Sequence, residues 1–252
     1  MSDFDRNYAA TRRFGADRAV AIDVGLRAHM IRVYNYMAAG VALTGLVAWL
    51  TFQFAVTTTS TGALALTPFG QAIYGTPLTW ILMLAPLGLV FFISFRINTL
   101  SASTARLLFF IYAAALGVSL SVIFLVYTHA SITRVFFISA ASFGALSVWG
   151  YTTKRDLTAF GSFLIMGLFG IIIASLVNIF LGSNQLQWII SVVGVLVFAG
   201  LTAWDTQKIK EMYDPMDDGT ISGRKAVMGA LSLYLDFINL FLSLLRLFGD
   251  RR

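Results

Sequence analysis

Long apolar stretches separated by short polar connections dominate this chain. Continuous runs rich in Leu, Ala, Phe and Gly recur along it, without the strict alternation of apolar and polar residues that barrel strands show. Each run covers roughly 20 residues, the length that a helix needs to cross about 30 Å of hydrocarbon at 1.5 Å per residue. The pattern predicts seven spanning helices, at residues 33–56, 78–96, 107–128, 132–152, 159–181, 186–207 and 226–248.

Two of the connections between these runs are longer than the others. Residues 57–77 are uncharged and rich in threonine, whereas residues 208–225 are charged and rich in Asp, Pro and Gly. Both are predicted to be loops. We expect one bundle without an internal domain boundary, with a cytoplasmic N-terminal segment at 1–32, a seven-helix transmembrane domain at 33–248 and a tail at 249–252.

Composition places these helices in a lipid bilayer rather than in a soluble core. Of the 252 residues, 58% are hydrophobic and only 12% charged, and the mean hydropathy is +0.80. An ordinary soluble domain carries about twice that share of charge. Cysteine is absent and the two histidines, His29 and His129, lie far apart, so no zinc or catalytic-histidine spacing exists. We therefore expect an all-α integral membrane protein that is not an enzyme and needs no cofactor.

Lysine and arginine predict the orientation of the helices. The net charge of +6 could indicate nucleic acid, but these residues cluster at helix ends, which fits basic cytoplasmic loops better. We expect no nucleic-acid partner. With the N-terminus in the cytoplasm, fourteen of the 18 lie on the cytoplasmic side. Arg251 and Arg252 are exceptions that a re-entrant last helix would explain, but about 23 apolar residues favour a full span.

Two carboxylates inside the predicted spans carry the candidate chemistry. Asp205 lies near the cytoplasmic end of the sixth span, and Asp236 lies in the middle of the seventh. A charge at the bilayer centre costs a few kcal/mol, and intramembrane carboxylates therefore tend to mark ion or proton paths. Because an inner loop joins the two spans, we expect their carboxyl groups to lie within hydrogen-bonded or water-bridged reach.

The last span also carries a polar stripe. Ser232, Asp236, Asn239, Ser243 and Arg246 follow one another at steps of four and three residues, which places them on one face of a helix. Such a face cannot point at lipid, so the last helix should be surrounded by the others. Hydrogen bonds between helices would explain the stripe. A pore lined by Ser232, Asn239 and Ser243 explains its length better.

Arg96 ends the second span on the same side as Asp205. One interpretation is a positive-inside residue that extends its charge to the membrane surface. The other is a gating latch, in which Arg96 forms a salt bridge with Asp205 and closes the inner mouth.

Pairs of small residues four positions apart predict close helix packing inside the bundle. They are Gly117 with Ser121, and Ala140 with Gly144.

Two segments resemble a known family. Residues 228–249, MGALSLYLDFINLFLSLLRLFG, strongly resemble the C-terminal signature of the Bax inhibitor family, the transmembrane Bax-inhibitor-motif proteins. Residues 205–209, DTQKI, resemble that family's aspartate motif on the sixth helix. The resemblance extends to the seven-span layout of the whole chain. Trp204 stands where the family usually has tyrosine, and the first external loop looks longer than is common.

This resemblance implies six helices in two three-helix layers around a central C-terminal helix. It also implies a pH-sensitive calcium leak, in which the matching Asp205 and Asp236 sense protons and bind calcium weakly. Family members are further linked to cytoprotection and, in bacteria, to regulation of membrane proteolysis. We expect a bacterial inner membrane protein.

Three functions remain open from the sequence. The first is a pH-gated, calcium-permeable leak channel; two close carboxylates tend to share a proton, and they offer calcium too few of its six to eight oxygens for tight binding. The second is a regulatory protein that binds another membrane protein, such as a protease, and transports nothing. The third, an intramembrane aspartyl protease, is disfavoured because no glycine precedes Asp236 in Leu233-Tyr234-Leu235.

Overall fold

The computed structural model describes residues 3–58 and 64–252, with side chains from residue 24 onward. This part of the chain is almost entirely helical, as predicted. Its elements are α1 (Asp3–Ala55), β1 (Val56–Thr58), β2 (Leu64–Leu66), α2 (Pro68–Tyr74), α3 (Leu78–Arg96), α4 (Ala102–Leu120), α5 (Ile123–Val126), α6 (His129–Thr152), α7 (Thr158–Leu181), α8 (Asn184–Glu211) and α9 (Gly219–Phe248). Seven helices of the described chain are long and apolar enough to cross a bilayer.

The predicted spans match these seven helices, with differences at the start of the first span and within the third. α1 is helical from Asp3, so most of the predicted segment 1–32 continues the first span. The third span is interrupted after Leu120, because Ser121 turns its hydroxyl onto the Val118 carbonyl at 2.6 Å and α5 follows. The predicted loops also contain structure. Residues 1–2 and 59–63, with part of the threonine-rich stretch, lie outside the described residues.

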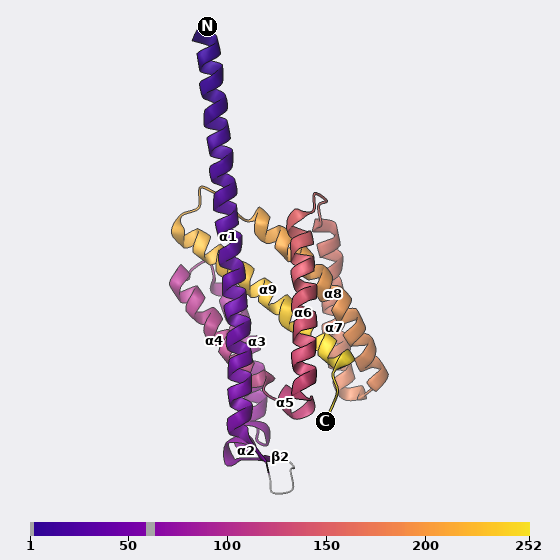
Figure 1. The fold of residues 1–252 in the computed structure, drawn as a ribbon. Coiled ribbons are helices and arrows are strands. Elements are labelled where there is room, and N and C mark those ends of the chain that lie inside the picture. Colours follow the sequence, from indigo (N-terminus) through magenta and orange to yellow (C-terminus); the bar gives the residue numbers. More distant parts are fainter. Residues whose placement is uncertain (1–2, 59–63) are drawn as a thin grey trace.

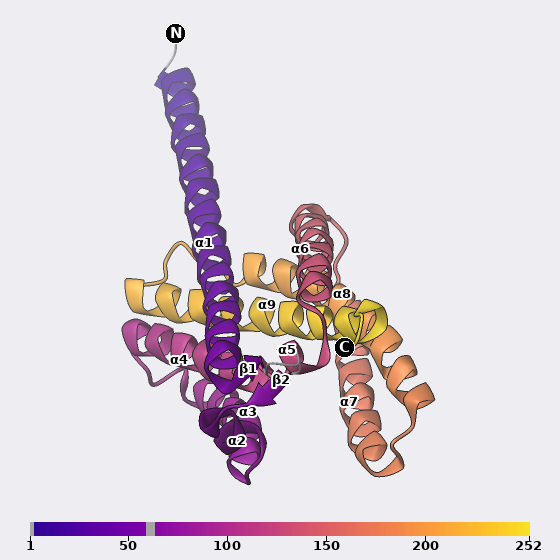
Figure 2. The ribbon, with the colours of Figure 1, turned by 60° about the horizontal axis from the view of Figure 1, so that its bottom comes forward.

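The spanning helices form two groups of three with α9 between them. α1, α3 and α4 pack together on one side, and α6, α7 and α8 pack together on the other. α9 crosses obliquely between the groups and packs on α1, α4, α6 and α8 (Figures 1 and 2). In the most apolar 18-residue stretch of α9, 72% of the residues are buried, whereas the corresponding share in α7 is 6%. The prediction of a central last helix between two three-helix layers is confirmed.

The ends of the bundle differ in charge. The basic end, at the top of Figure 1, holds the α3–α4, α6–α7 and α8–α9 connections, with Arg and Lys near each. The hairpin end holds the antiparallel pair β1–β2, then α2, and the C-terminus. α9 runs as one helix from the basic end to the hairpin end. The last span is therefore continuous rather than re-entrant.

Local chemistry fixes where the helices begin and turn. The side chains of Ser101, Thr128, Ser183 and Asp218 each accept a hydrogen bond from a backbone N–H three residues on, which caps α4, α6, α8 and α9. Gly182 ends α7 at a φ of 60°, a left-handed conformation that glycine adopts without strain. A tight turn can therefore join α7 to α8 at the hairpin end.

At the hairpin end, Thr67 links α2 to α1, and Asp250 links the C-terminal tail to α6. Thr67 accepts a hydrogen bond from the third residue of its helix, α2, and donates to the Phe54 carbonyl of α1 at 2.8 Å. The C-terminal tail returns against the start of α6, where Asp250 forms an ion pair with Arg134 at 2.8 Å. The exposed ion pair contributes little stability by itself, but it places the tail at the hairpin end.

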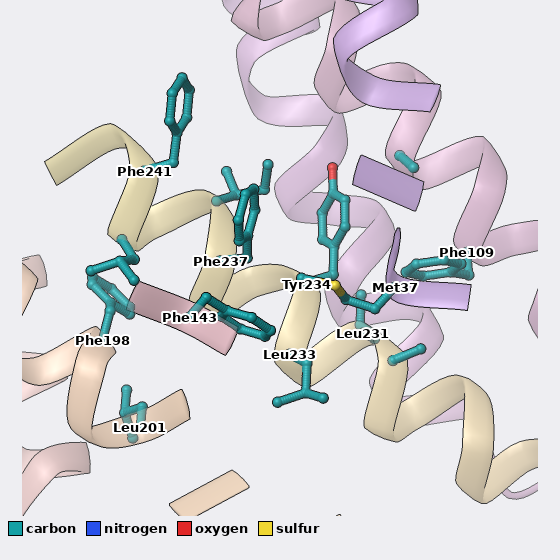
Figure 3. Close-up of a cluster of buried hydrophobic side chains, with 14 of the residues drawn as sticks. Met37, Phe109, Phe143, Phe198, Leu201, Leu231, Leu233, Tyr234, Phe237 and Phe241 are labelled. Atoms are coloured by element: carbon teal, nitrogen blue, oxygen red, sulfur yellow. The ribbon is translucent and has the colours of Figure 1, made fainter. Parts of the chain in front are cut away.

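The core is built around Tyr234 of α9, which has no exposed surface. Its hydroxyl lies 2.6 Å from Thr44 Oγ1 of α1, and that threonine also reaches the Ala113 carbonyl of α4 at 2.8 Å. The rings of Phe109 and Tyr112 pack edge-on against Tyr234, each at 5.7 Å between centroids. In Figure 3 the Tyr234 hydroxyl points away from Leu233 and the α8 residues that form the other side of the core. Tyr234 thus anchors α9 to the first helical group.

Candidate functional site

Three consecutive side chains of α8 contact three different neighbours. Asp205 faces α9. Thr206 brings its hydroxyl to 3.4 Å from that of Tyr34 on α1. Gln207 fixes the connection at 153–157, since its Nε2 donates to one loop carbonyl at 2.8 Å and its Oε1 accepts from a loop N–H at 2.8 Å. Successive helical residues lie about 100° apart, so this short motif ties α8 to three parts of the bundle at once.

The structure brings Asp205 and Asp236 together, as the sequence predicts. The two carboxyl groups interact across the α8–α9 contact. Asp236 is 5% exposed, and its Oδ2 has no hydrogen-bond partner among the described residues. A carboxylate only accepts hydrogen bonds, so a direct hydrogen bond between the two would require a proton on one of them. Two full charges about 4 Å apart would repel by about 4 kcal/mol at an effective dielectric constant of about 20, which favours a shared proton.

A cavity of about 360 Å³ at the basic end reaches Asp205 but is not lined by Asp236. Asp205 and Ser232 lie on its wall together with Lys208, Arg224 and Lys225. Apolar side chains of α8 and α9 and the start of the α3–α4 connection complete the walls. Each of the three cations is already engaged in the structure. The cavity therefore exposes one acid of the pair, Asp205, and carries positive charge around it.

The three cations are held by different groups. Lys208 Nζ lies 4.9 Å from the centre of the Trp204 ring. Lys225 forms an ion pair with Asp217 at 2.6 Å. Arg224 donates a hydrogen bond to the backbone carbonyl of residue 98 in the α3–α4 connection. The opening is thus narrowed by α9 reaching across to the first helical group.

The remaining stripe residues have different surroundings. Ser232 is half-buried and lines the cavity. Asn239 is half-buried and turns its amide back to the Leu235 carbonyl at 2.8 Å. Ser243 is 6% exposed, and a Cβ added to Gly194 of α8 would lie 2.7 Å from its hydroxyl oxygen. Ser243 therefore lies at a close α8–α9 contact rather than beside open space in this structure. The pore-lining roles of Asn239 and Ser243 stay predictions.

The structure does not place Arg96 against Asp205. Arg96 is exposed at the end of α3, and among the described residues it forms no ion pair. The physical reason is that α3 packs on α4 and α2 rather than on α8. Arg224 occupies the position at the opening that the sequence interpretation gave to Arg96. The predicted salt bridge is absent from this arrangement of the helices.

Of three functional groups that the sequence analysis did not assign, only Lys225 had a recognisable signal in the sequence. Lys225 lies seven residues before Ser232, so it continues the polar stripe by two helical turns. Gln207 follows Asp205 within the motif, but nothing in a single sequence shows that its amide bridges a loop. Arg224 could not be assigned either, because its partner is a backbone carbonyl 126 residues away.

The carboxyl pair is not a complete metal site by itself. Over the part of the chain that the structure describes, no group of three or more His, Asp or Glu side chains could hold a metal ion. Two carboxylates and the Ser232 hydroxyl provide hard oxygen ligands, but calcium prefers six to eight. Any calcium ion here would keep much of its water, which suits weak binding.

Over most of its length the chain is similar to known bacterial membrane proteins. The family model described as Inhibitor of apoptosis-promoting Bax1 matches residues 26–252. The Inner membrane protein YbhL of Escherichia coli (strain K12) is 46% identical over 239 residues, covering 94% of this chain and 97% of that protein. An uncharacterized protein of Rickettsia prowazekii is 46% identical over 230 residues, covering 91% of this chain and 92% of its own length. The match extends over nearly the whole sequence, and on these grounds the chain belongs to the Bax inhibitor family of membrane proteins.

Proposed function

We propose that this protein is a pH-sensitive leak pathway for calcium, in which Asp205 and Asp236 share a proton and transiently bind the passing ion. The observation that carries this proposal is the cavity at the basic end that is lined by Asp205, which in turn interacts with the buried Asp236. Among the described residues neither acid forms an ion pair, and a buried pair of acids is costly in a bilayer. Function explains its presence better than helix packing does.

The polar stripe supports a path that continues beyond the pair. At the far end of the stripe, Arg246 lines a second cavity of about 280 Å³ together with Ser175, Asn178 and Gln187. Ser232 and Arg246 are separated by about 21 Å along the helix, at 1.5 Å per residue. Two cavities therefore lie at opposite ends of one stripe, and the close Gly194–Ser243 contact lies along the helix between them. We infer that the structure represents a closed arrangement.

Protonation changes the pair in two opposing ways. With one shared proton the two acids hold each other across the α8–α9 contact. When both ionise, they repel and offer more oxygen ligands to calcium. When both are protonated, the mutual repulsion is gone, but calcium has lost its ligands. We therefore expect calcium flux to vary with pH rather than to switch fully on or off.

Arg224 is the residue that we expect to close the opening. Its hydrogen bond to the α3–α4 connection ties α9 to the first helical group, and its charge opposes entry of a cation. Arg224→Ala should raise the basal calcium leak, whereas Arg96→Ala, a matched arginine outside the cavity, should leave it near the wild-type value. Equal leak rates for Arg224→Ala and wild type would show that Arg224 does not close the opening.

A regulatory role without transport is the alternative. α1 extends past the other helices at the basic end (Figure 1), and such a projection could contact another membrane protein. Calcium flux in liposomes that contain only this protein separates the two proposals. Flux above that of protein-free liposomes supports the leak pathway. Flux equal to that of protein-free liposomes at every pH supports the regulatory role.

A further inference from the structure

Two apolar cavities follow the seam between α1 and α6, away from the carboxyl pair. The basic-end seam cavity, of about 500 Å³, is lined by Arg27 and Tyr34 of α1 and by Phe143, Ser147 and Tyr151 of α6, among others. The hairpin-end seam cavity, of about 330 Å³, continues along the same two helices, with aromatic side chains of α9 at its base. Figure 1 shows α9 crossing obliquely behind α1 and α6.

Two glycines keep this seam open. A Cβ added to Gly144 of α6, or to Gly45 of α1, would meet no atom within 4 Å. Glycine costs about 1 kcal/mol relative to alanine inside a helix, so glycine here needs a reason other than tight packing. By contrast, a Cβ at Gly117 would lie 2.7 Å from the Thr44 carbonyl oxygen. The predicted small-residue packing is therefore confirmed at Gly117 and wrong at Gly144, which faces open space.

Polar groups gather at the basic end of the seam. Ser147 is 5% exposed, and its hydroxyl has no hydrogen-bond partner among the described residues. Serines in apolar helices commonly bond the carbonyl four residues earlier, as Ser139 does at 2.8 Å. Arg27 is exposed at the rim. Lys210 does not line the cavity but lies beside its lining residue Tyr151, because its Nζ donates to the Tyr151 carbonyl at 2.9 Å and lies 5.0 Å from the centre of that ring.

The size of the cavity fits a lipid chain. Residues 27–34 of α1 cover about 10 Å of helix axis along it. The volume of about 500 Å³ leaves room for a hydrocarbon chain. Cations at one end and apolar walls along the rest match an anionic amphiphile.

We propose that the basic-end seam cavity binds one phospholipid. Its acyl chain lies between α1 and α6 beside Gly144, and its phosphate contacts Arg27 and Lys210. The Ser147 hydroxyl donates to an ester carbonyl of the lipid, which satisfies the buried group. Such a lipid would fill the seam between the two helical groups. Unlike the surrounding bilayer lipids, it would stay bound at one position.

Native mass spectrometry of the full-length protein, purified in mild detergent, tests this site. Gly144→Leu fills the cavity without a clash, because a side chain there meets open space. Gly170→Leu is the matched control, since a Cβ on Gly170 of the exposed α7 also meets nothing within 4 Å. Wild type and Gly170→Leu should each retain one phospholipid. Gly144→Leu should lose at least about tenfold in retained lipid, which corresponds to ~1.4 kcal/mol.

Back-titration with mixed micelles of phosphatidylglycerol or phosphatidylcholine separates the contributions of the groups. Arg27→Gln should reduce the preference for phosphatidylglycerol, while Ser147→Ala should weaken both lipids similarly. Inorganic phosphate should not displace the lipid; displacement would show a site for free phosphate and overturn the proposal. Circular dichroism melts confirm that each variant folds.

Two other outcomes would also overturn the proposal. If Gly144→Leu and Gly170→Leu retain the same lipid as wild type, the retained molecule is only surface lipid. If wild type is a dimer that Gly144→Leu converts to a monomer without loss of lipid, a second copy of the chain occupies the seam.

Discussion

The anchor between Tyr234 and Thr44 allows a quantitative test of how α9 is held. Tyr234→Phe keeps the buried ring and its edge-on contacts, and removes only the hydroxyl that lies 2.6 Å from Thr44 Oγ1. One buried hydrogen bond contributes about 1 kcal/mol, and side-chain hydrogen bonds between membrane helices average about 0.6 kcal/mol. We therefore expect the free energy of unfolding to fall by about 0.5–1.5 kcal/mol.

Thr44→Val should cost more than Tyr234→Phe. It removes the group that reaches both Tyr234 and the Ala113 carbonyl, and it leaves the tyrosine hydroxyl buried without a partner. Such an orphaned group costs about 1–3 kcal/mol. The double variant should be no less stable than Thr44→Val, because removing both partners leaves no orphaned tyrosine hydroxyl.

A double-mutant cycle measured by reversible unfolding in mixed micelles checks this reasoning. The expected coupling energy between positions 44 and 234 is about 1 kcal/mol. Additive effects, within about 0.3–0.5 kcal/mol, would mean that the two hydroxyls do not interact. The account of how α9 is attached to the first helical group would then be refuted.

Three further outcomes follow from the same structure. Gly150→Ala should destabilise the fold by about 1–3 kcal/mol, because its Cβ would lie 2.2 Å from the Ala203 carbonyl oxygen; an unchanged melting temperature would contradict this. Ser243→Cys should react poorly with a lipid-soluble thiol reagent, whereas Phe180→Cys, at a position 90% exposed, should react readily. Hydrogen bonds from Thr158 at the start of α7 lower the pKa of Asp156. They therefore stabilise that turn fully at pH values above the ordinary pKa of Asp, and this stabilisation is lost as the pH falls through the lowered pKa. Amide exchange at residues 158–160 should accelerate over that pH range, and Asp156→Asn should remove the acceleration.

The apolar periodicity was sufficient to predict the helices and the central position of α9. Apolar runs of spanning length can cross a bilayer only as helices, which predicts the seven spans. The polar stripe through Asp236 cannot face lipid, which predicts that the other helices surround the last one. The pairing of Asp205 with Asp236 was predicted from the loop that joins their helices on the inner side. These features depend on the local sequence pattern and on the thickness of the bilayer, so one sequence is enough to predict them.

Long-range placement could not be predicted in the same way. Whether Arg96 or Arg224 reaches the opening depends on how α3 packs against its neighbours, since Arg96 at the end of α3 and Arg224 near the start of α9 lie on the same side. Gly144 has the spacing of a packing residue, yet it faces a cavity because the two helical groups separate at α1 and α6. In the loop at 57–77, α2 is too short for a clear apolar period and depends on Thr67 for its start.

Calcium flux into liposomes, measured from mildly acidic to mildly alkaline pH for wild type and Asp236→Asn, tests the central claim most directly. Ser139→Ala is the control, since Ser139 of α6 lies outside the polar stripe and its hydroxyl bonds the Val135 carbonyl of its own helix. The carboxyl pair as proton sensor predicts a pH-dependent flux for wild type and for Ser139→Ala, and a flat profile for Asp236→Asn. A pH profile for Asp236→Asn that matches wild type, or wild-type liposomes that leak no faster than protein-free ones, would contradict it.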